Sequence, residues 1–121
     1  MLPTFGNNDF QFHYQVPNIT LRDAFYTEIM NDWFQNIAFN AKNVNYELIK
    51  TTFKSGGYYR VNLPGSRISV LALNTICFSN KDINSNQGGQ QEMQLQWLEE
   101  QLSSAESTRK FIITNHIYFG L

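Results

Sequence analysis

The chain has 121 residues, of which 42% are apolar and 15% aromatic, and its formal net charge is −1. This length and composition fit one domain, or a part of one, with enough apolar side chains to build a core. Nine Lys and Arg residues against ten Asp and Glu argue against a dedicated nucleic-acid-binding surface. No apolar run approaches the roughly 20 residues that a membrane-spanning helix needs, and no signal peptide is visible.

The first part of the sequence predicts a strand end, a loop and a long amphipathic helix. Residues 1–5 are an apolar run, and Gly6 then permits a tight turn. Residues 10–19, which include His13, are expected to form a loop. Thr20 resembles a helix N-cap with Asp23 three positions later, and apolar side chains then recur at four-residue spacing. These apolar positions are Leu21, Phe25, Ile29, Trp33 and Ile37, and Phe34 and Ala38 widen the apolar stripe.

The middle of the sequence predicts an antiparallel hairpin or meander. A turn is expected at residues 55–57, which read Ser-Gly-Gly, and strands are expected at 58–63 and 68–73. The Pro64-Gly65 pair between the two strands is typical of a turn.

The last part predicts a loop, a helix and a strand. Residues 79–91 are polar and contain Gly88-Gly89. A second amphipathic helix follows and ends near residues 103–107; its apolar positions are Met93, Leu95, Trp97, Leu98 and Leu102. Residues 111–114 read Phe-Ile-Ile-Thr and predict a short buried strand. The order of strand, helix, hairpin, helix and strand predicts a layered α/β fold.

Two single residues allow alternatives. Cys77 is the only cysteine, so it is either a buried thiol or half of a disulfide with a partner outside this chain. Asn18 begins the sequon Asn18-Ile19-Thr20 and permits N-glycosylation if the protein is secreted.

Two polar motifs directly follow apolar runs and are the best functional candidates. Gly6-Asn7-Asn8-Asp9 follows the first run, and Asn115-His116 follows the last. In open α/β proteins, ligands and metals bind just past the carboxyl ends of strands, and amide oxygen and imidazole nitrogen suit divalent metals. Each motif alone is more often a turn or a structural histidine. Two ligands also do not complete a hydrolytic metal site.

Four segments in order resemble the calcineurin-like metallophosphoesterases, in the branch of acid sphingomyelinase-like phosphodiesterases and vacuolar endopolyphosphatases. Residues 3–9 resemble the family's Gly-Asn-His-Asp/Glu motif, and residues 115–120 resemble its Gly-His-Ile-Pro-Pro-Gly strand end. Residues 56–61 with 71–75, and the helical residues 94–102, resemble the segments between those motifs.

The resemblance implies a layered α/β/β/α sandwich of which residues 1–121 form the central part, truncated at both ends. It implies two divalent metal ions, often zinc, that act on a phosphate ester. Asn7 and His116 would bind the same ion, and Asp9 would orient the Asn7 loop. Asn74, which follows a predicted strand, either braces the site or forms a turn. Substrates would be phosphoesters, including membrane lipids, or polyphosphate, in a secreted, lysosomal or vacuolar protein.

The sequence also departs from the family pattern. The early Asp-x-His and Gly-Asp motifs and the later Gly-His-x-His motif, which supply most metal ligands, are absent from this chain. Asn8 stands where many members have the histidine that protonates the leaving group, and an amide is no general acid. Endopolyphosphatase-like members share Gly-Asn-Asn-Asp, which favours polyphosphate or another good leaving group. Tyr118-Phe119 replaces Pro-Pro. The alternatives are a binding module that has lost catalysis and, more weakly, a protein-binding α/β adaptor.

Overall fold

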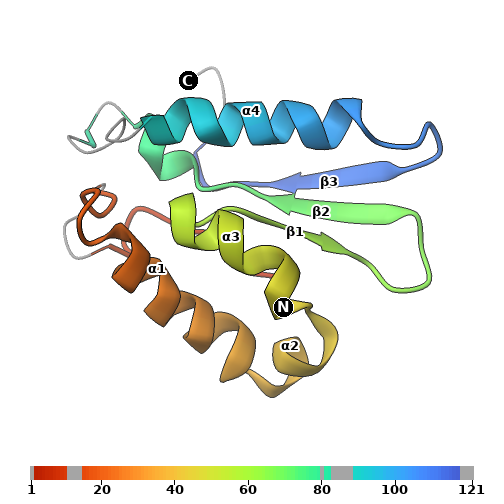
Figure 1. Ribbon diagram of the computed structural model, residues 1–121, viewed down its shortest axis with the longest axis horizontal. Helices are drawn as coiled ribbons and strands as arrows, with labels where there is room; N and C mark the ends of the chain where they lie inside the picture. Colours follow the sequence, from red (N-terminus) through yellow and green to blue (C-terminus); the bar gives the residue numbers. More distant parts are fainter. Residues whose placement is uncertain (1, 11–14, 80, 83–88, 118–121) are drawn as a thin grey trace.

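A three-stranded sheet with helices on both sides organises the chain in this computed structural model, which describes residues 2–10, 15–79, 81–82 and 89–117 (Figure 1). The strands are β1 (Tyr59–Asn62), β2 (Ile68–Ala72) and β3 (Lys110–Thr114), in the order β1-β2-β3. Strand β1 pairs antiparallel with β2, and β2 pairs parallel with β3. The mixed fold confirms the predicted α/β class.

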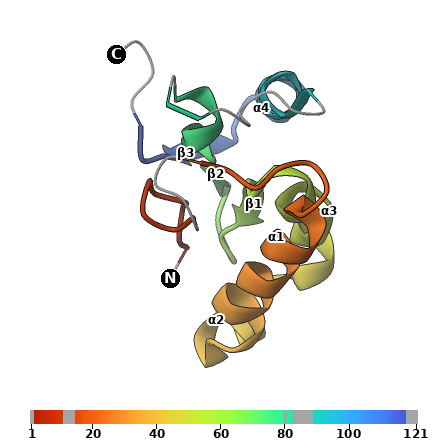
Figure 2. The same ribbon diagram turned by 90° about the vertical axis from the view of Figure 1, so that its left-hand side faces the viewer.

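The predicted hairpin is confirmed, and it places alternate residues of β1 on opposite faces of the sheet. On one face, the Tyr59 ring lies 5.0 Å from Phe34 and 5.8 Å from Phe53, between ring centroids. On the other face, the ring of Tyr58, which immediately precedes β1, lies 4.9 Å from Trp97 of α4 (Gln90–Ser103). Figures 1 and 2 show α4 on one side of the sheet and α1–α3 on the other.

The predicted first strand is not observed. Residues 2–10 contain no strand, because this segment pairs with no neighbouring strand in the described part of the chain. The segment nevertheless enters the core: Phe5 is completely buried, and the Tyr59 hydroxyl donates to the Pro3 carbonyl at 2.6 Å. Aromatic packing, and not a backbone ladder, holds it in place.

The predicted long helix is divided into three pieces. Helix α1 (Arg22–Met30) continues into a π-helical turn, η1 (Asn31–Gln35), and Ile37 then adopts an extended conformation before α2 (Ala38–Asn43). Thr20 is not the N-cap. Leu21 holds that position without a side-chain bond, and the Asn18 side chain accepts from the backbone N–H of Thr20 and Leu21 just before the helix.

The buried face of this helix is displaced by one residue from the predicted four-residue series, and Phe34, predicted to widen that stripe, is buried. Tyr26, Met30 and Phe34 are at most 1% exposed, whereas Phe25, Ile29 and Trp33 are only partly buried against the same core. The four-residue spacing therefore identified the helix, but most of its positions lie at the edge of the buried face. The displacement follows from α3 (Tyr46–Gly56), which packs closely on α1.

Helix α3 was not predicted, and the turn expected at residues 55–57 is its C-terminus. The Asn45 side chain caps the helix by accepting from Glu47 N–H, and Gly57 ends it with a φ of 74°. A Cβ on Gly57 would lie 2.7 Å from the rings of Phe5 and Tyr26, so glycine is required there for space as well as conformation.

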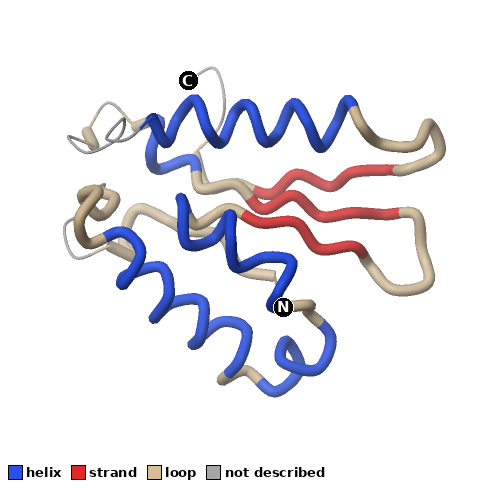
Figure 3. The backbone as a smooth tube through the Cα atoms, in the orientation of Figure 1, coloured by secondary structure: helices blue, strands red, loops and turns tan. Residues whose placement is uncertain are grey.

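The C-terminal helix and strand are confirmed, but their predicted burial is wrong. The buried side chains of α4 are Gln90 and Gln94, while Leu95 is 47% exposed. In β3, Ile112 and Ile113 are 49% and 42% exposed. Strand β3 is at one edge of the described sheet, so its side chains have fewer neighbours than those of β2. Figure 3 shows the three strands and the helices that flank them.

Cys77 is a buried thiol, the first of the two predicted alternatives. It lies in the short 3-10 helix η2 (Thr75–Phe78) and is 1% exposed. Its Sγ donates to the Asn74 carbonyl at 3.2 Å and accepts from Gln94 Nε2 at 3.3 Å. Burial raises the pKa of the thiol to about 12.

Candidate metal-ligand pair

Asn7 and His116 meet although they lie 109 positions apart in the sequence. The His116 Nε2 atom lies 2.6 Å from Asn7 Oδ1. His116 follows the carboxyl end of β3, and Asn7 follows the buried segment that contains Phe5. Their predicted convergence is therefore confirmed, whereas a role as metal ligands is a separate question.

The Asn7 loop is fixed from within its own motif. Asp9 Oδ2 accepts from the Gly6 backbone N–H at 2.7 Å, and Asp9 N–H donates to the Gly6 carbonyl at 3.2 Å. The Asn7 Nδ2 group donates to Asn8 Oδ1 at 3.4 Å. Because the amide nitrogen is directed toward Asn8, the amide oxygen is presented to His116. Asp9 thus closes the turn that contains Asn7 by bonding the backbone of Gly6.

Gly6 allows the His116 ring to approach the loop. A Cβ on Gly6 would lie 3.4 Å from His116 Nδ1 and 3.6 Å from Asp9 Oδ2. Both distances are ordinary van der Waals contacts. A methyl group on residue 6 would therefore touch the imidazole and the carboxylate that closes the turn without displacing them.

The segment after β3 is held by the segment after β2. The Ile117 N–H donates to Thr75 Oγ1 at 2.9 Å, and the Leu73 N–H donates to the Thr114 carbonyl at 2.9 Å. These bonds lie on either side of His116 in the sequence. Thr75, which sequence reasoning missed, is therefore the side chain that positions the residue following His116.

Asn74 lies in the core, where its side chain bonds groups other than the pair. Its Nδ2 donates to the Tyr26 hydroxyl at 3.0 Å and to the Gly56 carbonyl at 2.9 Å. Its backbone N–H and carbonyl are both bonded by the Gln94 side chain, at 2.9 and 3.0 Å. Any support that Asn74 gives to the site passes through the backbone to its neighbour Thr75.

The burial of this network keeps its hydroxyl groups protonated. Tyr26 is completely buried, and desolvation raises its pKa far above the ordinary value, with a further rise from Cys77 nearby. The Tyr26 hydroxyl is therefore a neutral acceptor for Asn74 at any pH at which the protein folds.

The donor set fits two ligands of one divalent ion. Imidazole nitrogen and amide oxygen bind borderline and hard ions respectively, and both side chains lie near the surface, where an ion could enter. At 2.6 Å the two atoms form a hydrogen bond. Tetrahedral ligands about 2.0–2.2 Å from zinc lie roughly 3.4 Å apart, so binding requires these atoms to separate by less than about 1 Å.

The rest of a metal centre is not found among the described residues. No group of three or more His, Cys, Asp or Glu side chains converges there. A catalytic zinc site normally takes three protein ligands, so Asn7 and His116 supply a part of one. His13, Tyr118 and Phe119 lie outside the described residues.

Comparison of the chain with protein-family models, with curated proteins and with solved structures found no match. Among the described helices, none has both the length and the apolar character required to cross a membrane.

Proposed function

We propose that this chain is a segment of a metal-dependent phosphoric ester hydrolase of the calcineurin-like metallophosphoesterase type, in which Asn7 and His116 bind the same ion. The observation that carries the proposal is the 2.6 Å approach of these two side chains across 109 positions. Each belongs to a motif that resembles a ligand motif of that family. A chance turn and a chance histidine would have no reason to meet.

The fold around the pair supports the proposal. A β2–α4–β3 unit joins two parallel strands, and His116 follows the carboxyl end of the second strand, where α/β proteins place their ligands. Helices lie on both sides of the sheet (Figure 2). In the proposed complete domain this sheet belongs to an α/β/β/α sandwich, with residues 1–121 as its central part.

The proposed cofactor is a pair of divalent ions, with zinc as the leading candidate. Bound metal supplies a Lewis acid that neutralises charge on the phosphate oxygens. Within this chain, Asn7 and His116 would hold one ion, Asp9 would keep the Asn7 loop closed, and Thr75 would keep the His116 segment in place. The ligands of the second ion are assigned to other parts of the complete domain.

Asn8 determines which esters the complete protein would cleave well. It is exposed next to the pair, and its amide cannot protonate a departing oxygen near neutral pH. Leaving groups that are stable anions need no such proton. The proposed substrates are therefore polyphosphate or activated phosphoesters ahead of lipid phosphodiesters.

The same observations also favour one alternative, a module that binds metal or phosphate without catalysis. Asn8 in place of an acid, and only two convergent ligands among the described residues, would suit such a module. Secretion or a lysosomal or vacuolar location, with glycosylation at Asn18, belongs to the hydrolase proposal. Asn18 is half-buried in the turn before α1.

A zinc titration of the purified chain tests the proposal. The two histidines give separate imidazole signals in NMR spectra, so the His116 signal can be followed beside that of His13. We expect weak binding that moves the His116 signal and that weakens at least about tenfold in Asn7→Ala, because that variant removes one of two ligands. His13→Ala is the matched control and should bind as the parent does. Binding that depends on His13 and not on Asn7 would refute the proposal.

A further inference from the structure

A pocket lies away from the Asn7–His116 pair, between α3, β1 and α4. Its volume is about 380 Å³, within the range of small-molecule sites. Arg60 and Asn62 of β1 and Gln101 of α4 line it, and its walls include Leu48 and Trp97. Phe111 lies beside Arg60 of this pocket, and Thr114 comes two residues before His116. These two residues of β3 are separated by roughly 10 Å, so the pocket and the pair lie toward opposite ends of the sheet.

The Arg60 guanidinium in this pocket is bonded only by neutral groups. Its Nε donates to Asn62 Oδ1 at 2.8 Å and its Nη1 to Gln101 Oε1 at 2.9 Å. Its Nη2 donates to Ser69 Oγ at 3.2 Å, and the Phe111 ring lies 5.5 Å from the guanidinium carbon. Three of its five N–H groups are used. No carboxylate forms an ion pair with it in the part of the chain that the structure describes.

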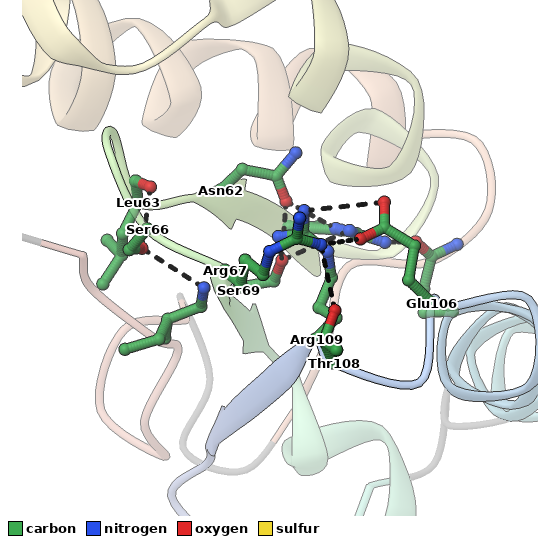
Figure 4. A network of polar contacts seen from close by, with 11 residues as sticks. Asn62, Leu63, Ser66, Arg67, Ser69, Glu106, Thr108 and Arg109 are labelled. Atoms are coloured by element: carbon green, nitrogen blue, oxygen red, sulfur yellow. Dashed lines mark hydrogen bonds and ion pairs between the residues drawn. The ribbon is translucent and has the colours of Figure 1, made fainter.

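A neighbouring charged group, Arg109, is also positive, and this repulsion disfavours the charged form of Arg60, which has no carboxylate partner among the described residues. Arg109 donates to the same Ser69 Oγ at 3.1 Å, so two guanidinium groups share one hydroxyl. Glu106 is the nearby carboxylate, but it bonds Arg67 at 2.9 Å and lies 4.0 Å from Arg109. Figure 4 shows Arg67, Ser69, Glu106 and Arg109 gathered near the start of β2 and β3. Desolvation, with Arg109 close by, lowers the pKa of Arg60.

The side-chain oxygens of Asn62 and Gln101 are already used as hydrogen-bond acceptors by Arg60. Because arginine only donates, the atoms of Asn62 and Gln101 that face it must be oxygens, which leaves their amide nitrogens for other partners. Asn45 likewise uses its oxygen to cap α3. These three amide nitrogens and the Trp97 indole N–H have no acceptor among the described residues. The unused polar hydrogens of Asn45, Asn62, Gln101 and Trp97 can therefore donate to a ligand in the pocket.

We propose that this pocket binds a small organic anion, with a phosphate or carboxylate group on Arg60 and an apolar or aromatic body against Trp97 and Leu48. A cluster of unused donors around an unpaired arginine is matched by an acceptor-rich group of opposite charge. The indole and the 72% exposed Leu48 provide apolar surface beside it. This site is independent of the proposed metal-ligand pair and of the hydrolase proposal.

The test is ¹⁹F NMR of the chain labelled with 5-fluorotryptophan, in the presence of EDTA. The chain has two tryptophans, and Trp33 packs against the core with its ring 4.6 Å from that of Phe5, away from the pocket, so its signal is an internal control. Phenyl phosphate and benzoate are the anionic probes, inorganic phosphate lacks the organic body, and phenol lacks the charge. We expect saturable shifts of the Trp97 signal with one or both organic anions, and binding at least about tenfold weaker for phosphate and phenol.

Two variants and one matched control connect the shift to Arg60. Arg60→Gln removes the charge, and Gln101→Glu keeps Arg60 but places a carboxylate beside it; each should weaken binding at least about tenfold. Lys110→Gln removes one positive charge at an exposed side chain outside the pocket, and it should leave binding unchanged.

Any of three results would overturn the proposal: no saturable Trp97 shift with either organic anion, equal binding of phenol, or unchanged binding in Gln101→Glu. Inorganic phosphate that binds as tightly as phenyl phosphate would exclude a contribution from the apolar wall and would overturn the organic part of the assignment. The comparison of phenyl phosphate with benzoate identifies which anionic group the pocket takes.

Discussion

Replacement of Gln94 by methionine should destabilise the protein. Helix α4 exposes several apolar side chains, but its Gln94 side chain is buried. Gln94 is 2% exposed and bonds both the N–H and the carbonyl of Asn74. Methionine has a similar length but offers no such donor or acceptor. Each buried backbone group left without a partner costs about 1–3 kcal/mol.

The Asn74 N–H is left without a partner while its carbonyl keeps the weak Cys77 thiol donor, so the loss is about 2–4 kcal/mol, from which about 1 kcal/mol of added apolar burial is subtracted. The total stability of a domain is typically about 5–15 kcal/mol. We therefore expect Gln94→Met to lower the free energy of unfolding by about 1–3 kcal/mol and Tm by roughly 5 °C or more.

Urea and thermal unfolding followed by circular dichroism measure this change. Gln96→Met is the matched control, because Gln96 is exposed on the same helix and its side chain bonds only Glu100, at 3.3 Å. Its effect should stay within about 0.5 kcal/mol. Equal stabilities of Gln94→Met and Gln96→Met would refute the view that Gln94 satisfies buried backbone groups.

A pH dependence follows from Gln94→Glu. The introduced carboxylate can still accept from the Asn74 N–H but, when ionised, cannot donate to the Asn74 carbonyl. Burial favours its protonated form, so its pKa in the folded state should exceed the unfolded value of about 4.3. The folded state then binds more protons, and the stability of this variant relative to the parent should fall as pH rises from 4 to 8.

Three further outcomes are expected. Gly57→Ala should cost about 2–4 kcal/mol of unfolding free energy, because it combines a positive φ with a 2.7 Å clash. Gly65 has a φ of 69° but no atom within 4 Å of the position that a Cβ would take, so Gly65→Ala should cost about 1–2 kcal/mol. Equal costs for the two variants would exclude the clash. Cys77 should resist alkylation by iodoacetamide at pH 8 and react fully in guanidinium chloride, and rapid labelling of the folded chain would contradict its burial. The zinc-loaded chain should not hydrolyse a nitrophenyl phosphodiester, and steady hydrolysis abolished by His116→Ala would show that its site is complete.

Much of the secondary structure was predictable because its signals are local. The β1–β2 hairpin, α4 and β3 have the apolar patterns and turn residues of their type. Helix α3 was missed because its C-terminal Gly56-Gly57 pair resembles a hairpin turn. The apolar pattern after its cap, Asn45, is also too short to indicate a helix. Burial was less predictable: residues such as Ile112 are apolar in sequence but exposed in the described sheet.

The candidate site was partly predictable for a similar reason. Asn7 and His116 could be paired because both follow apolar runs and match motifs of one family. Thr75 and Gln94 could not be identified, because their roles depend on contacts with Ile117 and Asn74, 42 and 20 positions away. No local pattern marks a side chain that bonds the backbone of a distant segment.

The most direct test of the shared-ligand account is a zinc anomalous difference map from crystals of the chain grown or soaked with Zn²⁺. The account predicts a peak about 2.0–2.2 Å from both Asn7 Oδ1 and His116 Nε2, with these two atoms separated beyond their present 2.6 Å. A zinc ion bound by His116 while Asn7 keeps its bond to the ring, or no zinc at either residue at saturating concentration, would contradict it.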